Sequence, residues 1–370
     1  MKCKLGEIVD ITMGQSPKSI YYNQVGEGYP FLQGNRTFGL KYPTFDTYTT
    51  VMTKLAKSGD VIMSVRAPVG ALNITPRDMC LGRGVCSLRM KNGNQEFLYY
   101  MMKYYVSDLI SKESGTVFGS VNRNDINDLE VDIPENVEKQ VRIGRILSSI
   151  DDKIELNNQI NNNLEQQAQA IFKSWFVDLE PFSNRKPSDW SVSTLGNVSI
   201  MGAGGDKPQN VSPIKTDLYK YPIYSNGLSN EGLYGFTDKP KISEESVTVS
   251  ARGTIGFVCL RHIPYVPIVR LVTLTPKTEI ISAKYLYLWL KQLHITGTGT
   301  TQQQLTVPVF QKTEILVPSQ EIVTLFTATV DPIFEKIWAN QNENEKLSSL
   351  RDTLLPKLIS GELDVSSIDL

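Results

Sequence analysis

The sequence predicts an α+β protein in which two similar globular domains are separated by two long antiparallel helices that form a coiled-coil spacer. Three observations lead to this prediction. The chain has 370 residues, which is more than one ordinary hydrophobic core requires. Its two halves repeat the same motifs in the same order. Each half also ends in a long stripe of apolar residues at helical spacing.

The internal repeat has an offset of 180 to 190 residues. Arg66 and Gly70 in the first half correspond to Arg252 and Gly256 in the second, both at an offset of 186. The other ordered matches join Leu5-Gly6 with Leu195-Gly196, Tyr29-Pro30 with Tyr221-Pro222, Ser114-Gly115-Thr116 with Thr296-Gly297-Thr298, Pro134 with Pro318, and Asp151 with Asp331. A preserved order with a slowly drifting offset indicates duplication of one unit, so we expect a pseudo-two-fold internal repeat.

Each globular region combines short strands with one helix. Residues 60–65 and 246–250 are short runs rich in Val and Ile or Thr, bounded by turn residues, which is typical of β-strands. Each region also contains one predicted helix, at 96–111 in the first half and at 282–293 in the second. This mixture of elements predicts the α+β class for both domains.

The apolar stripes predict one long helix at the end of each half. Residues three or four positions apart lie on one face of a helix, and an apolar face has to be buried. The positions that we expect to pack are Leu147, Ile150, Ile154, Leu164, Ile171, Val330, Ile333, Ile337, Leu347 and Leu354. The natural partner of each stripe is the other stripe, which gives an antiparallel pair with a domain at each end. Pro332 lies inside the second stripe, so we expect a kink or break at 328–332, and Gly361 is the expected C-cap.

These elements divide the chain into five segments. They are a first globular domain at 1–133, a first helical spacer at 134–180, a linker and second globular domain at 181–318, a second helical spacer at 319–361 and a tail at 362–370. The two globular segments contain 15 and 14 Lys and Arg against 13 and 9 Asp and Glu, although the whole chain has a net charge of −1. Two mildly basic blocks separated by acidic helices are compatible with contacts to phosphate groups in both blocks.

Several function classes lack their sequence signatures. No apolar run is long enough to span a membrane, and the four cysteines form no Cys-x-x-Cys pair, so we expect a cytoplasmic protein. With only two histidines, His262 and His294, the chain offers little for acid–base catalysis or a metal cluster. Phosphate-binding and dinucleotide-binding glycine motifs are also missing. We therefore expect a non-catalytic chain with no metal and no cofactor of its own.

The chain resembles the DNA specificity subunits of Type I restriction-modification systems. The resemblance is carried by Val65-Arg66-Ala67 through Gly70, by Phe172-Lys-Ser-Trp-Phe-Val177, by Ser250-Ala-Arg-Gly253, and by the segment Leu350-Arg-Asp-Thr-Leu-Leu-Pro-Lys-Leu-Ile-Ser-Gly361. It covers nearly the whole chain, and the helical segments are its most specific part.

This resemblance implies a division of labour between subunits. The two globular segments would be target-recognition domains, each binding one half of a bipartite site in double-stranded DNA. The helices would dock two modification subunits, which carry S-adenosylmethionine and methylate adenine. Restriction subunits, where present, would add ATP-driven translocation and cleavage. The chain itself would be the recognition subunit of this methyltransferase complex.

Base recognition needs hydrogen-bonding side chains on loops, supported by contacts to phosphates. The candidate DNA-binding residues are Gln33, Asn35, Arg36, Lys41, Arg66, Arg83, Asn122, Arg123 and Asn124 in the first domain, and Asn226, Asn230, Lys239, Arg252, Arg270, Thr301, Gln302, Gln303 and Gln304 in the second. Arg66 and Arg252 stand out because both precede a glycine-containing turn. A structural arginine that binds nearby carbonyl groups explains them equally well, and ordinary polar loops explain the other positions.

Two other function classes remain open. In one, the chain is an independent DNA-modifying enzyme with an unrecognised active site; in the other, it is a helical scaffold whose β-rich lobes bind proteins rather than DNA. The specificity-subunit interpretation has a geometric consequence of its own. Domain centres held ~40 to 50 Å apart by the helices would meet half-sites roughly 12 to 15 base pairs apart.

Overall fold

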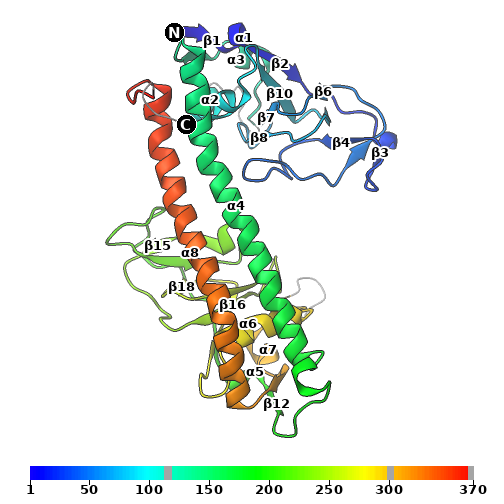
Figure 1. Ribbon diagram of the computed structural model, residues 1–370, viewed down its shortest axis with the longest axis vertical. Helices are drawn as coiled ribbons and strands as arrows, with labels where there is room; N and C mark the ends of the chain where they lie inside the picture. Colours follow the sequence, from blue (N-terminus) through cyan, green and yellow to red (C-terminus); the bar gives the residue numbers. More distant parts are fainter. Residues whose placement is uncertain (112–118, 298–303, 366–370) are drawn as a thin grey trace. The chain divides into compact units, whose positions relative to one another are not determined.

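The computed structural model describes residues 1–111, 119–297 and 304–365 of the chain. The fold is α+β, and the chain separates into two compact units. Unit 1 contains Met1–Gln159 and the segment from Ala339 onward, and unit 2 contains Ile160–Trp338. Each unit is one globular domain together with one half of each long helix (Figure 1). The compact units therefore differ from the sequence segments, because each half-helix packs on the domain beside it.

Unit 1 is built from short strands around one central helix. Its strands are β1 (Lys2–Lys4), β2 (Val9–Met13), β3 (Tyr22–Asn23), β4 (Tyr29–Leu32), β5 (Tyr48–Thr49), β6 (Leu55–Ala56), β7 (Val61–Ser64), β8 (Leu72–Ile74), β9 (Met79–Leu81), β10 (Val85–Met90) and β11 (Glu130–Asp132), and its helices within the domain are α1 (Leu5–Ile8), α2 (Gln95–Ser111) and α3 (Arg123–Asn127). In the described part of the chain, the four-stranded main sheet has the order β2-β10-β7-β8, and a five-stranded second sheet has the order β3-β5-β4-β9-β6. β1 pairs with β11, which links the start of the domain to its end.

Unit 2 repeats this plan. Its strands are β12 (Ser191–Thr194), β13 (Ser199–Ala203), β14 (Tyr221–Tyr224), β15 (Leu233–Thr237), β16 (Ser246–Ser250), β17 (Val258–Arg261), β18 (Val266–Pro267), β19 (Leu271–Pro276) and β20 (Glu314–Val317), and its helices within the domain are α5 (Leu195–Val198), α6 (Ala283–Gln292) and α7 (Val307–Phe310). The sheets with orders β13-β19-β16-β17 and β12-β20 match those of unit 1 strand for strand. The second sheet of unit 2 has the order β15-β14-β18. In both units two strands of the second sheet pair in parallel, β4 with β9 and β14 with β18.

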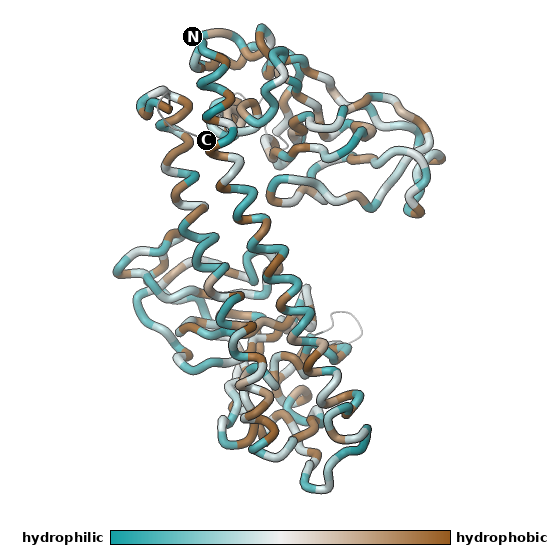
Figure 2. Tube along the Cα trace, in the orientation of Figure 1, coloured by the Kyte–Doolittle hydropathy of each residue, from teal (hydrophilic) through white to brown (hydrophobic). Residues whose placement is uncertain are grey.

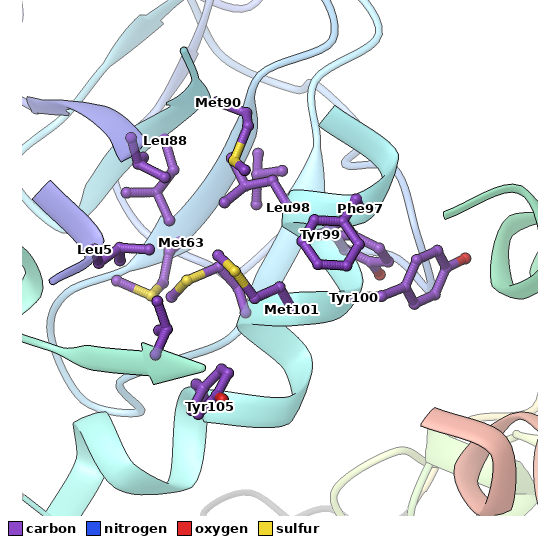
Figure 3. Close-up of a cluster of buried hydrophobic side chains, with 14 of the residues drawn as sticks. Leu5, Met63, Leu88, Met90, Phe97, Leu98, Tyr99, Tyr100, Met101 and Tyr105 are labelled. Atoms are coloured by element: carbon purple, nitrogen blue, oxygen red, sulfur yellow. The ribbon is translucent and has the colours of Figure 1, made fainter. Parts of the chain in front are cut away.

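The core of unit 1 lies between the main sheet and α2. Met63 of β7, Leu88 of β10 and Phe97 and Leu98 of α2 are fully buried against one another (Figure 3). Each buried side chain of this size contributes roughly 1.5 to 3 kcal/mol. The same cluster includes Leu147 from the first long helix.

The C-terminal segment completes this core. Leu358, Ile359 and Val365 each retain only 1% of their surface and belong to the same cluster as α2. Arg142 donates a hydrogen bond from Nη1 to the carbonyl oxygen of Val365 at 3.4 Å. The first domain therefore has a core made from residues near both ends of the described chain.

The long helices α4 (Val137–Phe176) and α8 (Gln320–Ile359) run antiparallel within each unit. In unit 1, Asp151 contacts Arg351 and Asn157 contacts Asn344. The residue numbers of the contacting pairs rise along α4 and fall along α8, so the two helices are antiparallel there. In unit 2, Phe172 of α4 packs on Phe326 of α8 with ring centroids 5.9 Å apart. Figure 2 shows hydrophobic residues recurring along both helices with hydrophilic positions between them.

The expected packing stripe is buried to different degrees. Leu147, Ile150, Ile154, Val330 and Ile337 are buried, whereas Leu164, Ile171, Ile333, Leu347 and Leu354 are partly buried. The break expected near Pro332 is wrong, because α8 continues without interruption through this residue. Val330 and Phe334 on either side of Pro332 are buried in the unit 2 core. Their packing outweighs the cost of roughly 3 kcal/mol for a proline inside a helix.

Within the described residues, no helix combines the length and the apolar composition needed to cross a lipid bilayer.

Candidate nucleic-acid interface

Several loops of the first domain meet where β7 ends. The backbone N–H of Val65 donates to the carbonyl of Gly84 at 2.9 Å, and the N–H of Gly84 donates to the carbonyl of Gln33 at 2.9 Å. The N–H of Val121 donates to the carbonyl of Val65 at 3.1 Å. Because these bonds are made by the backbone, they fix the loops whatever side chains the loops carry.

This arrangement brings four of the predicted DNA-binding residues together. Gln33, Asn35, Arg66 and Arg83 line one hollow of about 200 Å³. Arg66 and Arg83 are exposed, and their guanidinium groups make no hydrogen bond or ion pair with any residue that the structure describes. Two unpaired cations beside a glutamine and an asparagine form a surface that can bind both phosphates and base edges.

A larger hollow of about 740 Å³ adjoins the first and shares Gln33 with it. Arg36 lies on its wall and forms a bidentate pair with Asp46, at 2.9 and 2.6 Å from Nη2 to the two carboxylate oxygens. The hydrogen bond from Arg36, followed by that from Thr47, lowers the pKa of the Asp46 carboxyl group. Asp46 therefore stays ionised and holds the Arg36 guanidinium in one direction.

Lys41 does not belong to this surface, and its prediction as a DNA contact is not supported. Its side chain is only 4% exposed, and its ammonium group lies 2.6 Å from Asp152 and 2.9 Å from the Ser148 hydroxyl on α4. A buried, paired ammonium group holds its loop against the helix and is not available to a phosphate.

Asn122 lies immediately before α3, and Arg123 and Asn124 lie in the first turn of this helix. Asn122 is the N-cap of α3, and its side chain accepts hydrogen bonds from the N–H groups of Asn124 and Asp125. Its side chain therefore stabilises the helix. Arg123 and Asn124 are exposed beside it.

In the second domain, the corresponding loops meet where β16 ends. The N–H of Ala251 donates to the carbonyl of Arg270 at 2.8 Å, and the N–H of Leu305 donates to the carbonyl of Ala251 at 2.9 Å. The Asn226 side chain donates from Nδ2 to the carbonyl of Arg252 at 2.8 Å. These bonds bring Asn226, Arg252, Arg270 and Gln304 close together.

The two meeting points are equivalent in the repeat. Val65 and Ala251 hold the same position, 186 residues apart, and each receives and donates the same pair of backbone hydrogen bonds. Arg270 takes the place of Gly84 and has a left-handed backbone with φ of 74°. A non-glycine residue in this region is uncommon, and such residues concentrate at functional sites.

The remaining candidates of the second domain are scattered. Asn230 is exposed on the loop after β14, and Lys239 is exposed just after β15. Thr301, Gln302 and Gln303 lie outside the described residues.

Sequence reasoning missed Tyr22, Phe31, Asp46 and Thr47, which also line the larger hollow. Tyr22 and Phe31 pack with ring centroids 4.7 Å apart, as an ordinary core pair does. No local sequence pattern marks these residues, because the hollow forms only when β3, β4 and the β5 region come together.

Among the described residues, no cluster of His, Cys, Asp and Glu is arranged to hold a metal ion.

Comparison with known proteins identifies the family. The model of the Type I restriction modification DNA specificity domain matches residues 1–166 and 187–349. The chain belongs to this family. The two matched regions cover both halves of the internal repeat, so the chain contains two specificity domains.

Relatives of this specificity protein span most of its length. The Type I restriction enzyme MjaIX specificity subunit of Methanocaldococcus jannaschii is 27% identical over 352 residues, which covers 85% of this chain and 80% of the relative. A putative type I specificity subunit of Mycoplasma pneumoniae, S.MpnORF507P, is 32% identical over 267 residues, with 70% of this chain and 69% of the relative covered. The crystal structure of the S subunit of a Type I restriction-modification system from M. genitalium shares the fold, with a TM-score of 0.61, 18% identity and coverage of 99% and 96%.

Proposed function

We propose that this specificity protein is the non-catalytic DNA-recognition subunit of a Type I restriction-modification complex, and that each domain binds one half of a bipartite site in double-stranded DNA. The observation that carries the proposal is the equivalence of the two loop meeting points. Each domain uses the same backbone hydrogen bonds, around Val65 or Ala251, to present arginine and amide side chains. A duplicated scaffold with different side chains suits the reading of two different half-sites.

The chemistry of these side chains fits recognition of base edges. An arginine fork pairs with the O6 and N7 atoms of guanine, and an asparagine or glutamine amide pairs with the N6 and N7 atoms of adenine. Phosphate contacts position the domain and make the affinity depend on salt. In the first domain Arg66, Arg83, Gln33 and Asn35 supply these groups, and in the second domain Arg252, Arg270, Asn226 and Gln304 supply them.

The long helices supply a surface for partner subunits. Leu156 of α4 and Leu350 of α8 are 49% and 48% exposed, and Leu325 of α8 is 55% exposed. Exposed apolar side chains of this kind are available for contact with another chain. The modification subunits would dock here and carry S-adenosylmethionine, since the specificity chain supplies recognition rather than methyl transfer. Restriction subunits, where present, would join the same complex.

Substitution of the equivalent arginines tests the proposal. We expect Arg66→Ala to relax the methylated motif at one half-site only and Arg252→Ala to relax it at the other half-site only. Loss of one bidentate base contact lowers discrimination by about 5- to 150-fold. The measurement is methylome sequencing of a host that expresses the full chain, or a variant, with its modification subunits. Arg185→Ala, which removes an exposed arginine from the linker, is the matched control and should leave both half-sites unchanged.

Three outcomes would contradict the proposal. If the arginine variants broaden both halves together, the domains do not read separate half-sites. If the purified chain alone methylates or cuts DNA when given S-adenosylmethionine or magnesium, it is an independent enzyme. If the lobes show no sequence-dependent DNA binding even with modification subunits present, the chain is a scaffold whose lobes bind proteins.

A further inference from the structure

Residues 225–232, called the Asn226 loop here, have an unusual backbone. The loop follows β14 and is closed by a hydrogen bond from the N–H of Ser225 to the carbonyl of Gly232 at 2.8 Å. Three consecutive residues, Asn230, Glu231 and Gly232, have φ values of 48°, 54° and 82°. Residues with a Cβ atom rarely adopt this left-handed conformation, and a glutamate does so less readily than an asparagine. The loop therefore needs contacts from its surroundings to keep this shape.

Arg261, the last residue of β17, supplies these contacts through its guanidinium group. Its Nη2 donates to the carbonyl of Glu231 at 2.7 Å, and its Nη1 donates to the Glu231 carboxylate at 2.9 Å. Its Nε donates to the Thr248 hydroxyl at 3.0 Å, and the guanidinium carbon lies 3.6 Å from the centroid of the Tyr224 ring. The guanidinium group therefore contacts one residue of β16, one of β14 and one of the loop.

The other end of the same loop is tied to the candidate DNA-binding surface. Asn226 donates from Nδ2 to the carbonyl of Arg252, and its own carbonyl accepts a hydrogen bond from the Thr254 hydroxyl at 2.6 Å. The Asn226 loop and the turn that carries Arg252 are thus one connected structure. A shift of the loop at Glu231 would be transmitted to Asn226 and to the Arg252 backbone.

We propose that Arg261 is a positioning residue for recognition of the half-site read by the second domain. Arg261 is only 3% exposed, so it does not reach DNA itself. It holds the Asn226 loop in its left-handed conformation and thereby sets where Asn226 and Arg252 meet the bases. This inference rests on the proposed function, because it assigns Arg261 a role in the recognition carried out by that surface. The first domain has Thr75 at the corresponding position, 186 residues earlier, so the effect is confined to one half-site.

The test compares Arg261→Met with Lys284→Met in a complex reconstituted from the full chain and its modification subunits. Lys284 is also a buried cation of the second domain, paired with Glu245 at 3.0 Å and Asp331 at 2.9 Å, but its partners lie on α8 and before β16 rather than on the loop. Arg261→Met should lower base discrimination about tenfold at the half-site that Arg252→Ala also relaxes, which is the scale of one weakened base contact. Lys284→Met should lower the unfolding midpoint to a similar degree and leave the motif unchanged.

Arg261→Lys is the conservative variant, and it distinguishes a loss of positioning from a loss of folding. It keeps the charge and the aliphatic stem but lacks the planar fork that binds Glu231 twice, so it should show an intermediate relaxation at the same half-site. The inference is overturned if Arg261→Met and Arg261→Lys both keep the wild-type motif, or if Lys284→Met relaxes the motif as much as they do. Failure of the proposed function would give a different result, because the wild-type complex itself would then show no bipartite methylated motif.

Discussion

Arg351 on α8 is the residue whose removal should most weaken the attachment of this helix to the first domain. Its Nη1 lies 2.7 Å from the carboxylate of Asp151 on α4, which is only 1% exposed. The same carboxylate accepts a hydrogen bond from the Tyr100 hydroxyl at 2.8 Å and lies 3.6 Å from the Lys103 ammonium group on α2. Asp151 thus joins three helices, and Arg351→Ala would remove its nearest positive charge.

The magnitude follows from this geometry. Two unit charges 2.7 Å apart attract each other by about 6 kcal/mol at an effective dielectric constant of about 20. Desolvation cancels part of this attraction, and loss of one partner from a buried pair typically costs about 3 kcal/mol. Lys103 and Tyr100 still face Asp151 in the variant, so we expect Arg351→Ala to lower the free energy of unfolding by about 2 to 3 kcal/mol.

Urea unfolding followed by far-UV circular dichroism measures this change, because all four tryptophans lie in unit 2 and their fluorescence would not report on unit 1. Lys4→Ala is the matched control, because it breaks an exposed ion pair of the same unit, with Asp128 at 2.8 Å, and should leave the unfolding midpoint unchanged. A double-mutant cycle with Asp151→Asn should show strong coupling between Arg351 and Asp151. If Arg351→Ala is no more destabilising than Lys4→Ala, the buried pair does not hold α8 in place.

The pH dependence offers a second check on the same group. Burial opposes ionisation of Asp151, but Lys103, Arg351 and Tyr100 together lower its pKa below the ordinary value. The unfolded chain therefore binds a proton on Asp151 more readily than the folded chain does. The stability that Asp151 contributes is present above the ordinary aspartate pKa of about 4 and is lost as the pH falls below it. Arg351→Ala should reduce this acid-dependent loss, as urea unfolding at a series of pH values would show.

Four further changes have definite expected outcomes. Lys41→Met should lower the free energy of unfolding by about 2 kcal/mol in urea titrations and leave the salt dependence of DNA binding unchanged. Arg83→Ala should instead reduce the slope of log K against log salt by about one if it contacts a phosphate, and an unchanged slope would exclude that contact. Pro332→Ala should raise the stability by about 2 kcal/mol, since α8 continues through this residue; a loss of stability would mean that the proline suits the local backbone. Insertion of four residues at 157–163, about 6 Å of helix, should lengthen the methylated motif by one or two base pairs, and an unchanged motif would refute the role of the helices in setting the spacer.

The helices and the repeat could be predicted from the sequence because each depends on regular spacing. A period near 3.6 indicates α4 and α8 directly, and the shared offset of 186 gives Arg66 and Arg252 equivalent places in the two domains. The one helix predicted in each globular region corresponds to α2 and α6, whose observed bounds differ from the expected ones by one residue at most ends. These signals are local, so no knowledge of the tertiary structure is needed to read them.

The individual roles of polar residues could not be predicted in the same way. In the sequence, Lys41 has the context of an exposed loop lysine. In the structure, Asp152 of α4, 111 residues later, lies 2.6 Å from its ammonium group. Arg261 likewise has the sequence context of a strand residue, and its contacts depend on Glu231, 30 residues earlier, which has a left-handed backbone. Pairings between distant residues decide whether a charged side chain faces solvent or supports the fold, and no spacing rule encodes them.

The packing of the C-terminal segment into the first domain affects how the protein is made. Leu358, Ile359 and Val365 are part of a core whose other members lie mostly before residue 150. On a ribosome that adds roughly 5 to 20 residues per second, these side chains follow the first domain by on the order of ten to forty seconds. During that interval the apolar surface that they later cover is open to water and to chaperones. Nascent first domains should therefore complete their core only after residues 354–365 have been synthesised, whereas the core of the second domain needs the chain only as far as Trp338.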